Sequence, residues 1–309
     1  MNLATIIDGH PADAAALISR GRTTTYGSLR DEVAAYRGGL LSLGLEPGER
    51  VGILAGTNWY FVATYLAVLG VGCVAVPMNP TSPPRAIERE LNAVGAAAVF
   101  VGPAGRPAFG GVDRDKVPTL RNVIGPDDPD PKAPPDGEMA RLGVLLTSEP
   151  APIIDQADDD LAVLVFTSGT AGAPRPAMLT HGNLRSNLEQ VQAHPGRAVQ
   201  TSDVVFGVLP LFHIFGLNVA LGGALYAGAS ILLVERFDPT SAVESIQRHG
   251  VTLVLGAPAM WSSLSSLRDV DPGAFATVRI AASGAAKLDP EIEAAARERL
   301  GLTVTEGYG

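Results

Sequence analysis

The sequence has only one cysteine among its 309 residues, Cys73. A single cysteine excludes an intrachain disulfide framework. Because Cys73 lies inside an apolar run at residues 71–76, the pattern favours a buried strand thiol over a reactive nucleophile. The first residues, MNLAT, lack a basic stretch followed by an apolar one, so they predict no secretion or targeting signal, and we expect a cytoplasmic protein.

Positive charge is also scarce. The 23 Lys and Arg residues face 32 Asp and Glu residues, which gives a net charge of −9 without a basic cluster, so we expect no nucleic-acid partner. One uncharged stretch, residues 217–234, approaches the length of a membrane span, but Gly222, Gly223 and Gly228 interrupt it. We therefore predict a buried helix, a turn and a strand there, and no transmembrane segment. The sequence does not indicate an oligomeric state.

Apolar and small residues are abundant in the chain. Hydrophobic residues reach 46%, and 35 Gly and 24 Pro accompany few aromatic (6%) or charged (18%) residues, a mixture typical of α/β units joined by many turns. Strand-like apolar runs alternate with helix-period segments, which predicts parallel sheets with helices on their faces. The predicted strands cover residues 51–54, 73–78, 97–101, 161–166, 204–208, 231–234, 251–255, 278–281 and 302–305, and the predicted helices start near 26 and 180, follow residue 213, or cover 58–69, 86–94, 240–249, 259–267 and 290–300.

Residues 126–138 interrupt this alternation. They contain five prolines and four aspartates with almost no apolar character, which predicts an exposed connector. We expect possible sublobes at 1–125 and 139–309, with segments exchanged between them, so that the two halves of the sequence are not separate domains. The predicted fold class is α/β, with two stacked lobes that each contain a mostly parallel sheet.

A loop of hydroxyl and glycine residues follows the apolar run that ends at Phe166. Glycines allow backbone N–H groups to approach anionic oxygens, hydroxyls donate hydrogen bonds, and the cation of Arg175 offsets charge, which together suit a polyphosphate. The spacing is not that of the Walker sequence, and an ordinary turn has a similar composition. From composition alone, both interpretations stay open.

The longer stretch TSGTAGAPRPAMLTHGNL at residues 167–184 resembles the signature loop of the adenylate-forming family of acyl-CoA synthetases, luciferases and peptide-synthetase adenylation domains. Other stretches agree in order and spacing, including LGLEPGERV at 43–51, LPLFHIFG at 209–216, ASGAA at 282–286 and the final EGYG at 306–309. Three residues depart from the family pattern, namely Ala171, Arg175 and Pro176, and these changes predict a weaker hold on the outer phosphates. The resemblance implies ATP-phosphate binding by Thr167, Ser168, Gly169, Thr170, Gly172 and Arg175, with Thr170 as a candidate Mg²⁺ ligand.

The same resemblance assigns the remaining site residues. His213 would orient or stabilise the attacking carboxylate, although a lone histidine after an apolar strand is more often structural, and His181 is expected to hydrogen-bond within its own loop. A wall for the acyl group is implied at Phe212, Phe215 and Trp261, and an adenine site at Gly284, Ala285, Ala286, Gly307, Tyr308 and Gly309. For Tyr308 a core position is the alternative.

The resemblance implies a fatty-acid–CoA ligase that uses ATP, Mg²⁺ and coenzyme A. A carboxylate would attack the α-phosphate of ATP, and the thiol of coenzyme A would then take the acyl group. Two alternatives stay open: an acyl-AMP ligase or adenylation domain that loads a carrier protein, and a non-catalytic module that binds a nucleotide or acyl adenylate. Since the family's β-barrel, further motifs and C-terminal lobe would follow Gly309, we expect this chain alone to be incompetent for full turnover.

Overall fold

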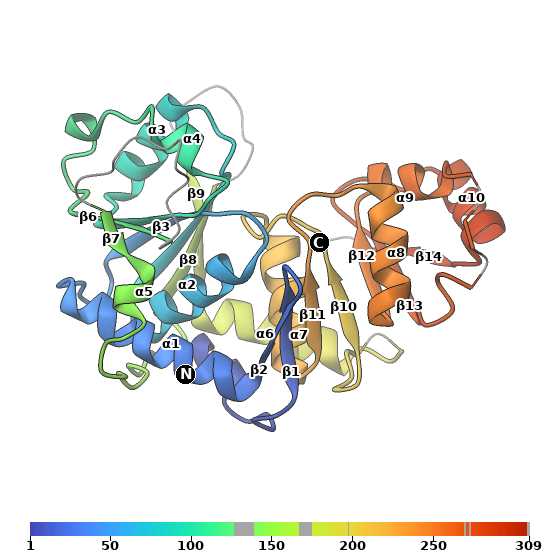
Figure 1. The fold of residues 1–309 in the computed structure, drawn as a ribbon, viewed down its shortest axis with the longest axis horizontal. Helices are drawn as coiled ribbons and strands as arrows, with labels where there is room; N and C mark the ends of the chain where they lie inside the picture. Colours follow the sequence, from blue (N-terminus) through green and yellow to red (C-terminus); the bar gives the residue numbers. More distant parts are fainter. Residues whose placement is uncertain (127–138, 167–174, 197, 269, 272, 308–309) are drawn as a thin grey trace. The chain divides into compact units, whose positions relative to one another are not determined.

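A computed structural model describes the chain except for residues 127–138, 167–174, 197, 269, 272 and 308–309 (Figure 1). The described residues form two compact units. Unit 1 contains Met1–Ala12 and Tyr26–Asn187, and unit 2 contains Asp13–Thr25 and Leu188–Gly309. The division falls after Asn187, and the predicted connector at 126–138 lies within the sequence span of unit 1.

Unit 1 is built on a seven-stranded sheet in the described part of the chain. Every strand pair in it is parallel except β8–β9, which is antiparallel. All five residues of β4 are buried, as expected for a strand covered on both faces. In spatial order the strands are β7 (Met139–Arg141), β6 (Asn122–Gly125), β5 (Ala98–Val101), β3 (Arg50–Leu54), β4 (Val74–Met78), β8 (Leu161–Phe166) and β9 (Pro176–Thr180).

The helices of unit 1 begin and end where local chemistry predicts. The side chain of Asn58 caps α2 by accepting the Phe61 N–H at 3.3 Å, and Gly95 ends α3 in the left-handed conformation. Ile87 and Leu91 of α3 pack against β4 and β5 in one apolar cluster. The helices are η1 (Leu3–Ile7), α1 (Tyr26–Ser42), α2 (Trp59–Gly70), α3 (Pro84–Val94), α4 (Arg106–Phe109), η2 (Arg114–Lys116), α5 (Leu142–Leu145) and α6 (His181–Ala193), which leads into unit 2.

Unit 2 also has a seven-stranded sheet in its described residues, and its N-terminal hairpin comes from far away in the sequence. Strands β1 and β2 are joined at Arg20 and Gly21, whose φ values of 50° and 77° suit a tight hairpin turn. β1 then pairs in parallel with β11. In spatial order the strands are β14 (Val304–Glu306), β13 (Ile280–Ser283), β12 (Leu253–Gly256), β10 (Val204–Gly207), β11 (Ser230–Leu233), β1 (Ala15–Ser19) and β2 (Arg22–Thr25).

Helices α8 (Pro239–His249), α9 (Pro258–Ser265) and α10 (Pro290–Leu300) gather beside β12, β13 and β14 (Figure 1). Their apolar side chains share one core with the sheet, centred on the fully buried Trp261 and Phe206. Both α8 and α10 start with an Asp cap and a Pro, and both end at a left-handed Gly, the signals that set helix ends in sequence. The two mostly parallel sheets confirm the predicted α/β class.

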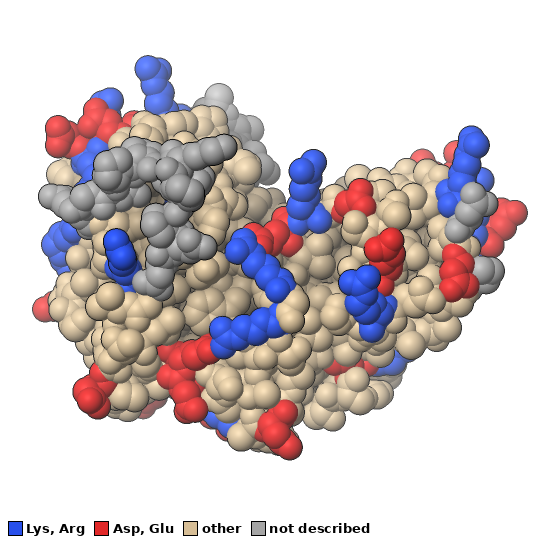
Figure 2. Space-filling view, in the orientation of Figure 1, with Lys and Arg blue, Asp and Glu red and all other residues tan. Residues whose placement is uncertain are grey.

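The apolar stretch at 217–234 folds into several short elements. It contains most of a π-helix, η3 (Phe215–Gly222), followed by α7 (Gly223–Ala227), the left-handed Gly228 and strand β11. Across the described ranges, no helix combines the length and the apolar character that crossing a membrane requires. On the face drawn in Figure 2, acidic and basic side chains of the described residues are interspersed over a largely uncharged surface.

Candidate active site

The predicted phosphate loop connects two neighbouring strands of unit 1. β8 runs antiparallel to β9, with Phe166 opposite Pro176, so the loop is the connection of a hairpin. Thr167, Ser168, Gly169, Thr170 and Gly172 lie outside the described residues. The helix predicted near residue 180 is α6, which begins at His181, but strand β9 between the loop and this helix was not predicted. The first residue of β9 is a proline, a residue that the edge strand of a sheet tolerates.

Arg175 is exposed where β9 begins. It lines a cavity of about 580 Å³ that belongs entirely to unit 1 and is also lined by Arg50 and Met178. The guanidinium of Arg50 donates to the carbonyls of Val94 at 2.7 Å and Gly48 at 3.3 Å. Arg175 directly precedes β9, so the start of this strand sets its position. Its role at the phosphates of ATP stays a prediction.

The predicted carboxylate-binding residues follow the carboxyl end of β10 in unit 2. His213 is exposed, and its backbone N–H donates to the Pro210 carbonyl at 3.1 Å. The centroid of its ring lies 5.0 Å from that of Phe212. The π-helix η3 starts two residues later, at Phe215. π-Helices are rare, but those that occur are often found at functional sites. Their wider turn displaces side chains from the directions that they take in an α-helix.

Phe215 and Gly284 are 69 residues apart in sequence but in contact in unit 2. A Cβ added to Gly284 would lie 2.8 Å from Cε1 and 3.0 Å from Cζ of the Phe215 ring. Only a glycine allows this close approach without displacing the ring. The contact joins a residue predicted for the acyl wall to one predicted for the adenine site.

The remaining adenine-site residues lie at the carboxyl ends of β13 and β14. Ala285 has a φ of 69°, a conformation that costs energy for a residue with a side chain, and both Ala285 and Ala286 are exposed. The Gly307 N–H donates to the Ser283 carbonyl at 2.8 Å, so the two strand ends are held side by side. Tyr308 and Gly309 lie outside the described residues.

Residues with small side chains lie at one edge of the unit 2 sheet, where Ala285 and Ala286 are exposed and Gly284 is buried. The carboxyl ends of β10, β12, β13 and β14 meet there because these strands are parallel. This is the edge at which open parallel sheets bind ligands. A flat heterocycle could stack on the two exposed alanines, and the binding of adenine at this edge stays a prediction.

Trp261 is the predicted acyl-wall residue with no exposed surface. Its ring is fully buried in the core of unit 2, and its Nε1 donates to the Ala282 carbonyl at 3.3 Å. Its neighbour Met260 would collide with any side chain at Gly256, since a Cβ there would lie 1.9 Å from Met260 Cε. Trp261 supports the end of β13 in this structure, and its contact with an acyl group stays a prediction.

Sequence reasoning overlooked two polar groups at the same edge. Ser283 is fully buried, and its Oγ has no hydrogen-bond partner within the described part of the chain. Glu306 is exposed opposite Ser283 in the β13–β14 register, and its Oε1 accepts the Leu288 N–H at 3.4 Å. Both residues sit inside the motifs ASGAA and EGYG, so the signal was present but was attributed to their neighbours.

Among the residues that the structure describes, no group of three or more His, Cys, Asp or Glu side chains is placed to hold a metal ion. The candidate Mg²⁺ ligand Thr170 lies outside them. Mg²⁺ in nucleotide enzymes is usually held by one or two protein groups and the phosphates themselves, so such a cluster is not required.

Comparison with known proteins places this arrangement in a family. The profile of the AMP-binding enzyme family matches residues 3–309, and the chain belongs to this family. Curated relatives include a 4-coumarate–CoA ligase of Pinus taeda, 32% identical over 96% of this chain and 55% of the relative, and 4-coumarate–CoA ligase 3 of Arabidopsis thaliana, 29% identical over 94% and 51%. A Mycobacterium tuberculosis CoA ligase named for a propanoyl group that carries a methyl-dioxo-octahydroindenyl substituent is 30% identical over 89% of this chain and 54% of the relative. The chain thus spans about half the length of the curated relatives it matches.

Solved structures share the fold. An anthranilate CoA ligase in complex with anthranoyl-AMP superposes with a TM-score of 0.91 at 22% identity, over all of this chain and 60% of the other. ATP-bound MatB from Rhodopseudomonas palustris superposes with a TM-score of 0.85 at 26% identity, over all of this chain and 59% of the other. The fold expected from the signature loop, that of the N-terminal domain of adenylate-forming enzymes, is confirmed.

Proposed function

We propose that this protein acts in ATP-dependent acid–thiol ligation. A carboxylate oxygen attacks the α-phosphorus of ATP, and the bond to pyrophosphate breaks. The thiolate of coenzyme A then attacks the acyl carbon, and AMP leaves. The observation that supports this most is the family match over residues 3–309. In agreement with it, the predicted adenine residues Gly284 and Gly307 follow the carboxyl ends of the adjacent strands β13 and β14.

Within this proposal, the residues take separate roles. His213 orients the carboxylate, and Gly284, Ala285, Ala286 and Gly307 pack against the adenine. Arg175 offsets negative charge on the departing pyrophosphate. Thr170 would hold Mg²⁺, which would supply further positive charge to the phosphates. A planar guanidinium replaces the compact ammonium usual at this position, and it retains the charge.

Calorimetric titration tests the proposal on the chain itself. We expect binding of a non-hydrolysable acyl-adenylate analogue, and weaker binding of ATP with Mg²⁺. Arg175→Ala should weaken ATP binding about tenfold, the effect of losing one charge-assisted contact, without changing the affinity for the analogue, which lacks the β- and γ-phosphates.

Arg89→Ala is the matched control, because Arg89 is an exposed arginine on α3 of the same unit. It should leave both affinities unchanged. If neither ligand binds the unmodified chain, the assigned sites are wrong. If both arginine variants weaken ATP equally, a general charge effect replaces the specific role of Arg175.

The acid is proposed to be hydrophobic. The motif resemblance favours a fatty acid, while the names of several relatives specify aromatic acids such as 4-coumarate and anthranilate. Phe215, fixed against Gly284, offers a flat ring to either class. Displacement of the bound analogue by AMP plus a free acid, with cinnamate-type acids and medium- or long-chain fatty acids compared, separates the two. Stronger displacement by the aromatic series would overturn the fatty-acid assignment.

A further inference from the structure

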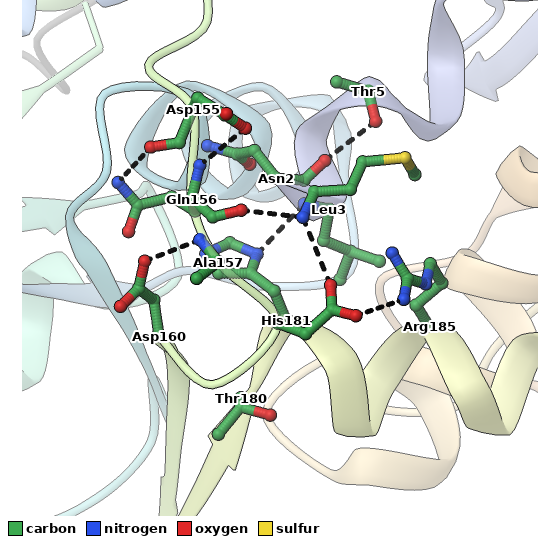
Figure 3. A network of polar contacts seen from close by, with 12 residues as sticks. Asn2, Leu3, Thr5, Asp155, Gln156, Ala157, Asp160, Thr180, His181 and Arg185 are labelled. Atoms are coloured by element: carbon green, nitrogen blue, oxygen red, sulfur yellow. Dashed lines mark hydrogen bonds and ion pairs between the residues drawn. The ribbon is translucent and has the colours of Figure 1, made fainter.

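The N-terminal helix of unit 1 is held by a buried histidine (Figure 3). His181 begins α6 and is only 1% exposed. Its Nδ1 accepts the backbone N–H of Leu3 at 3.0 Å, across 178 residues of sequence. The prediction that this side chain forms a hydrogen bond within its own loop is therefore wrong, because the ring faces η1.

This hydrogen bond defines the protonation state of the ring. Because Nδ1 accepts, the imidazole is neutral and carries its proton on Nε2, which is buried without a partner among the described residues. A second proton would have to enter at Nδ1. It would point at the Leu3 N–H, so two donors would face each other and the bond could not persist.

The bond closes a short apolar segment onto the unit. Leu3, Ile6 and Ile7 of η1 are buried, and η1 packs against α2. Asn2 adds a second anchor, since its Nδ2 donates to the carbonyls of Leu69 at 2.6 Å and Ile154 at 2.9 Å. Neither Asn2 nor these carbonyls titrates, so of these two anchors it is His181 that responds to pH.

Charged groups surround the ring from three segments. Asp158 accepts from Arg185 of α6 at 2.5 Å and from the Met1 ammonium at 3.2 Å, and Asp160 accepts the Ala157 N–H at 2.7 Å. Burial, and after it the Met1 ammonium, lower the pKa of His181, whereas Asp160 and Asp158 raise it, and the combined effect is a pKa of about 4. The neutral form is thus maintained until the pH is well below that at which a free histidine is protonated.

We propose that the neutral imidazole of His181 is an acid-sensitive latch, which holds η1 against the start of α6 and releases it when Nδ1 is protonated. Release would expose the apolar side chains of Leu3, Ile6 and Ile7, a surface that can bind another apolar surface. The device belongs to unit 1 alone and does not depend on the proposed ligase activity.

Hydrogen–deuterium exchange tests the latch directly. The readout is the protection factor of a peptide that covers residues 1–8, which divides out the intrinsic effect of pH on exchange. We expect the protection to fall about tenfold or more between pH 7 and pH 4.5, while peptides from α2 and β4 stay protected.

Two substitutions at the histidine separate the latch from general acid unfolding. His181→Asn places an amide oxygen where Nδ1 lies and cannot be protonated, so its protection should be independent of pH over this range. His181→Phe retains a ring but loses the acceptor, and should be poorly protected at every pH. His194→Asn, which replaces an exposed histidine, should behave as the unmodified protein.

Two outcomes would overturn the proposal. One is a protection factor that does not change with pH in the unmodified protein. The other is a His181→Asn variant that still loses protection on acidification, because Asp158, Asp160 or the Met1 ammonium would then be the group that titrates.

Discussion

A single missing Cβ determines how two predicted subsites meet in unit 2. Gly284 lets the Phe215 ring lie against the backbone at the end of β13, where a methyl group would be 2.8 Å from the ring. Contacts this short force either the ring or the strand to move. The predicted acyl wall and the predicted adenine edge thus meet at this one position.

Gly284→Ala should therefore weaken binding of the acyl-adenylate analogue by about 1–2 kcal/mol, which is about five- to thirtyfold, because the displaced ring no longer fits the ligand. Calorimetric titration measures the effect. Gly9→Ala is the matched control, since a Cβ at Gly9 meets nothing within 4 Å and should leave the affinity unchanged.

A second substitution checks the cause. Phe215→Leu in the Gly284→Ala background shortens the side chain that clashes, and part of the lost affinity should return. Equal affinities for Gly284→Ala and the unmodified chain would show that the contact does not influence the ligand site.

At the scale of elements, one buried carboxylate joins three strands at the amino edge of the unit 2 sheet. Asp203 is 2% exposed and precedes β10. It accepts from Thr252, which precedes β12, at 2.7 Å, and from both Nε (2.8 Å) and Nη2 of Arg279, which precedes β13. Burial by itself would raise the pKa of Asp203, but hydrogen bonds from Arg279, the Gln200 N–H and Thr252 hold it below its ordinary value.

Asp203→Asn should destabilise unit 2 by about 3 kcal/mol, because it leaves the guanidinium of Arg279 without its charged partner. The chain has one tryptophan in each unit, so in a Trp59→Phe background Trp261 is the only tryptophan, and its fluorescence follows unit 2 during urea denaturation. Glu293→Gln, which breaks an exposed pair with Arg297 on α10, should change the stability by no more than about 0.5 kcal/mol. If Asp203→Asn changed the stability as little as Glu293→Gln does, the buried pair would have no stabilising role.

At the scale of the whole molecule, acid should affect unit 1 through His181. Its pKa is lowered from 6.5 to about 4 in the fold, so the unfolded chain binds the proton more readily. The contribution to stability is therefore complete above pH 6.5 and is lost as the pH falls toward 4. We expect this loss to be about 3 kcal/mol.

The comparison that isolates this term is between the unmodified protein and His181→Asn. Urea denaturation at pH 7.5 and pH 4.5, followed by hydrogen exchange of unit 1 peptides, should show a greater acid loss for the unmodified chain. Parallel losses in the two proteins would assign the effect to other groups.

Local patterns predicted most elements of both sheets. The helix predicted at 290–300 is α10, Asn58 caps α2, and most predicted strands differ from the observed ones by one or two residues at their ends. Buried parallel strands appear as apolar runs, and Asp, Pro and Gly mark helix ends through interactions within a few residues. These signals need no knowledge of distant partners.

Elements that depend on distant partners were overlooked. β1 at Ala15–Ser19 acquires its place by pairing with β11, more than two hundred residues further on, and β9 starts with a proline that weakens any strand signal. A π-helix and an α-helix have the same apolar composition, so η3 could only be predicted as a helix. The division after Asn187 likewise depends on which segments pack together.

The sequence by itself determined the family, the α/β class and the identity of the candidate site residues, because signature motifs and short-range periodicity are written in consecutive residues. Only the tertiary structure decided that Phe215 lies on Gly284, that His181 accepts from Leu3 and that Trp261 is buried beneath β13. Such contacts join residues far apart in sequence, and they exist because buried polar groups must find hydrogen-bond partners and side chains must fill the core without overlap.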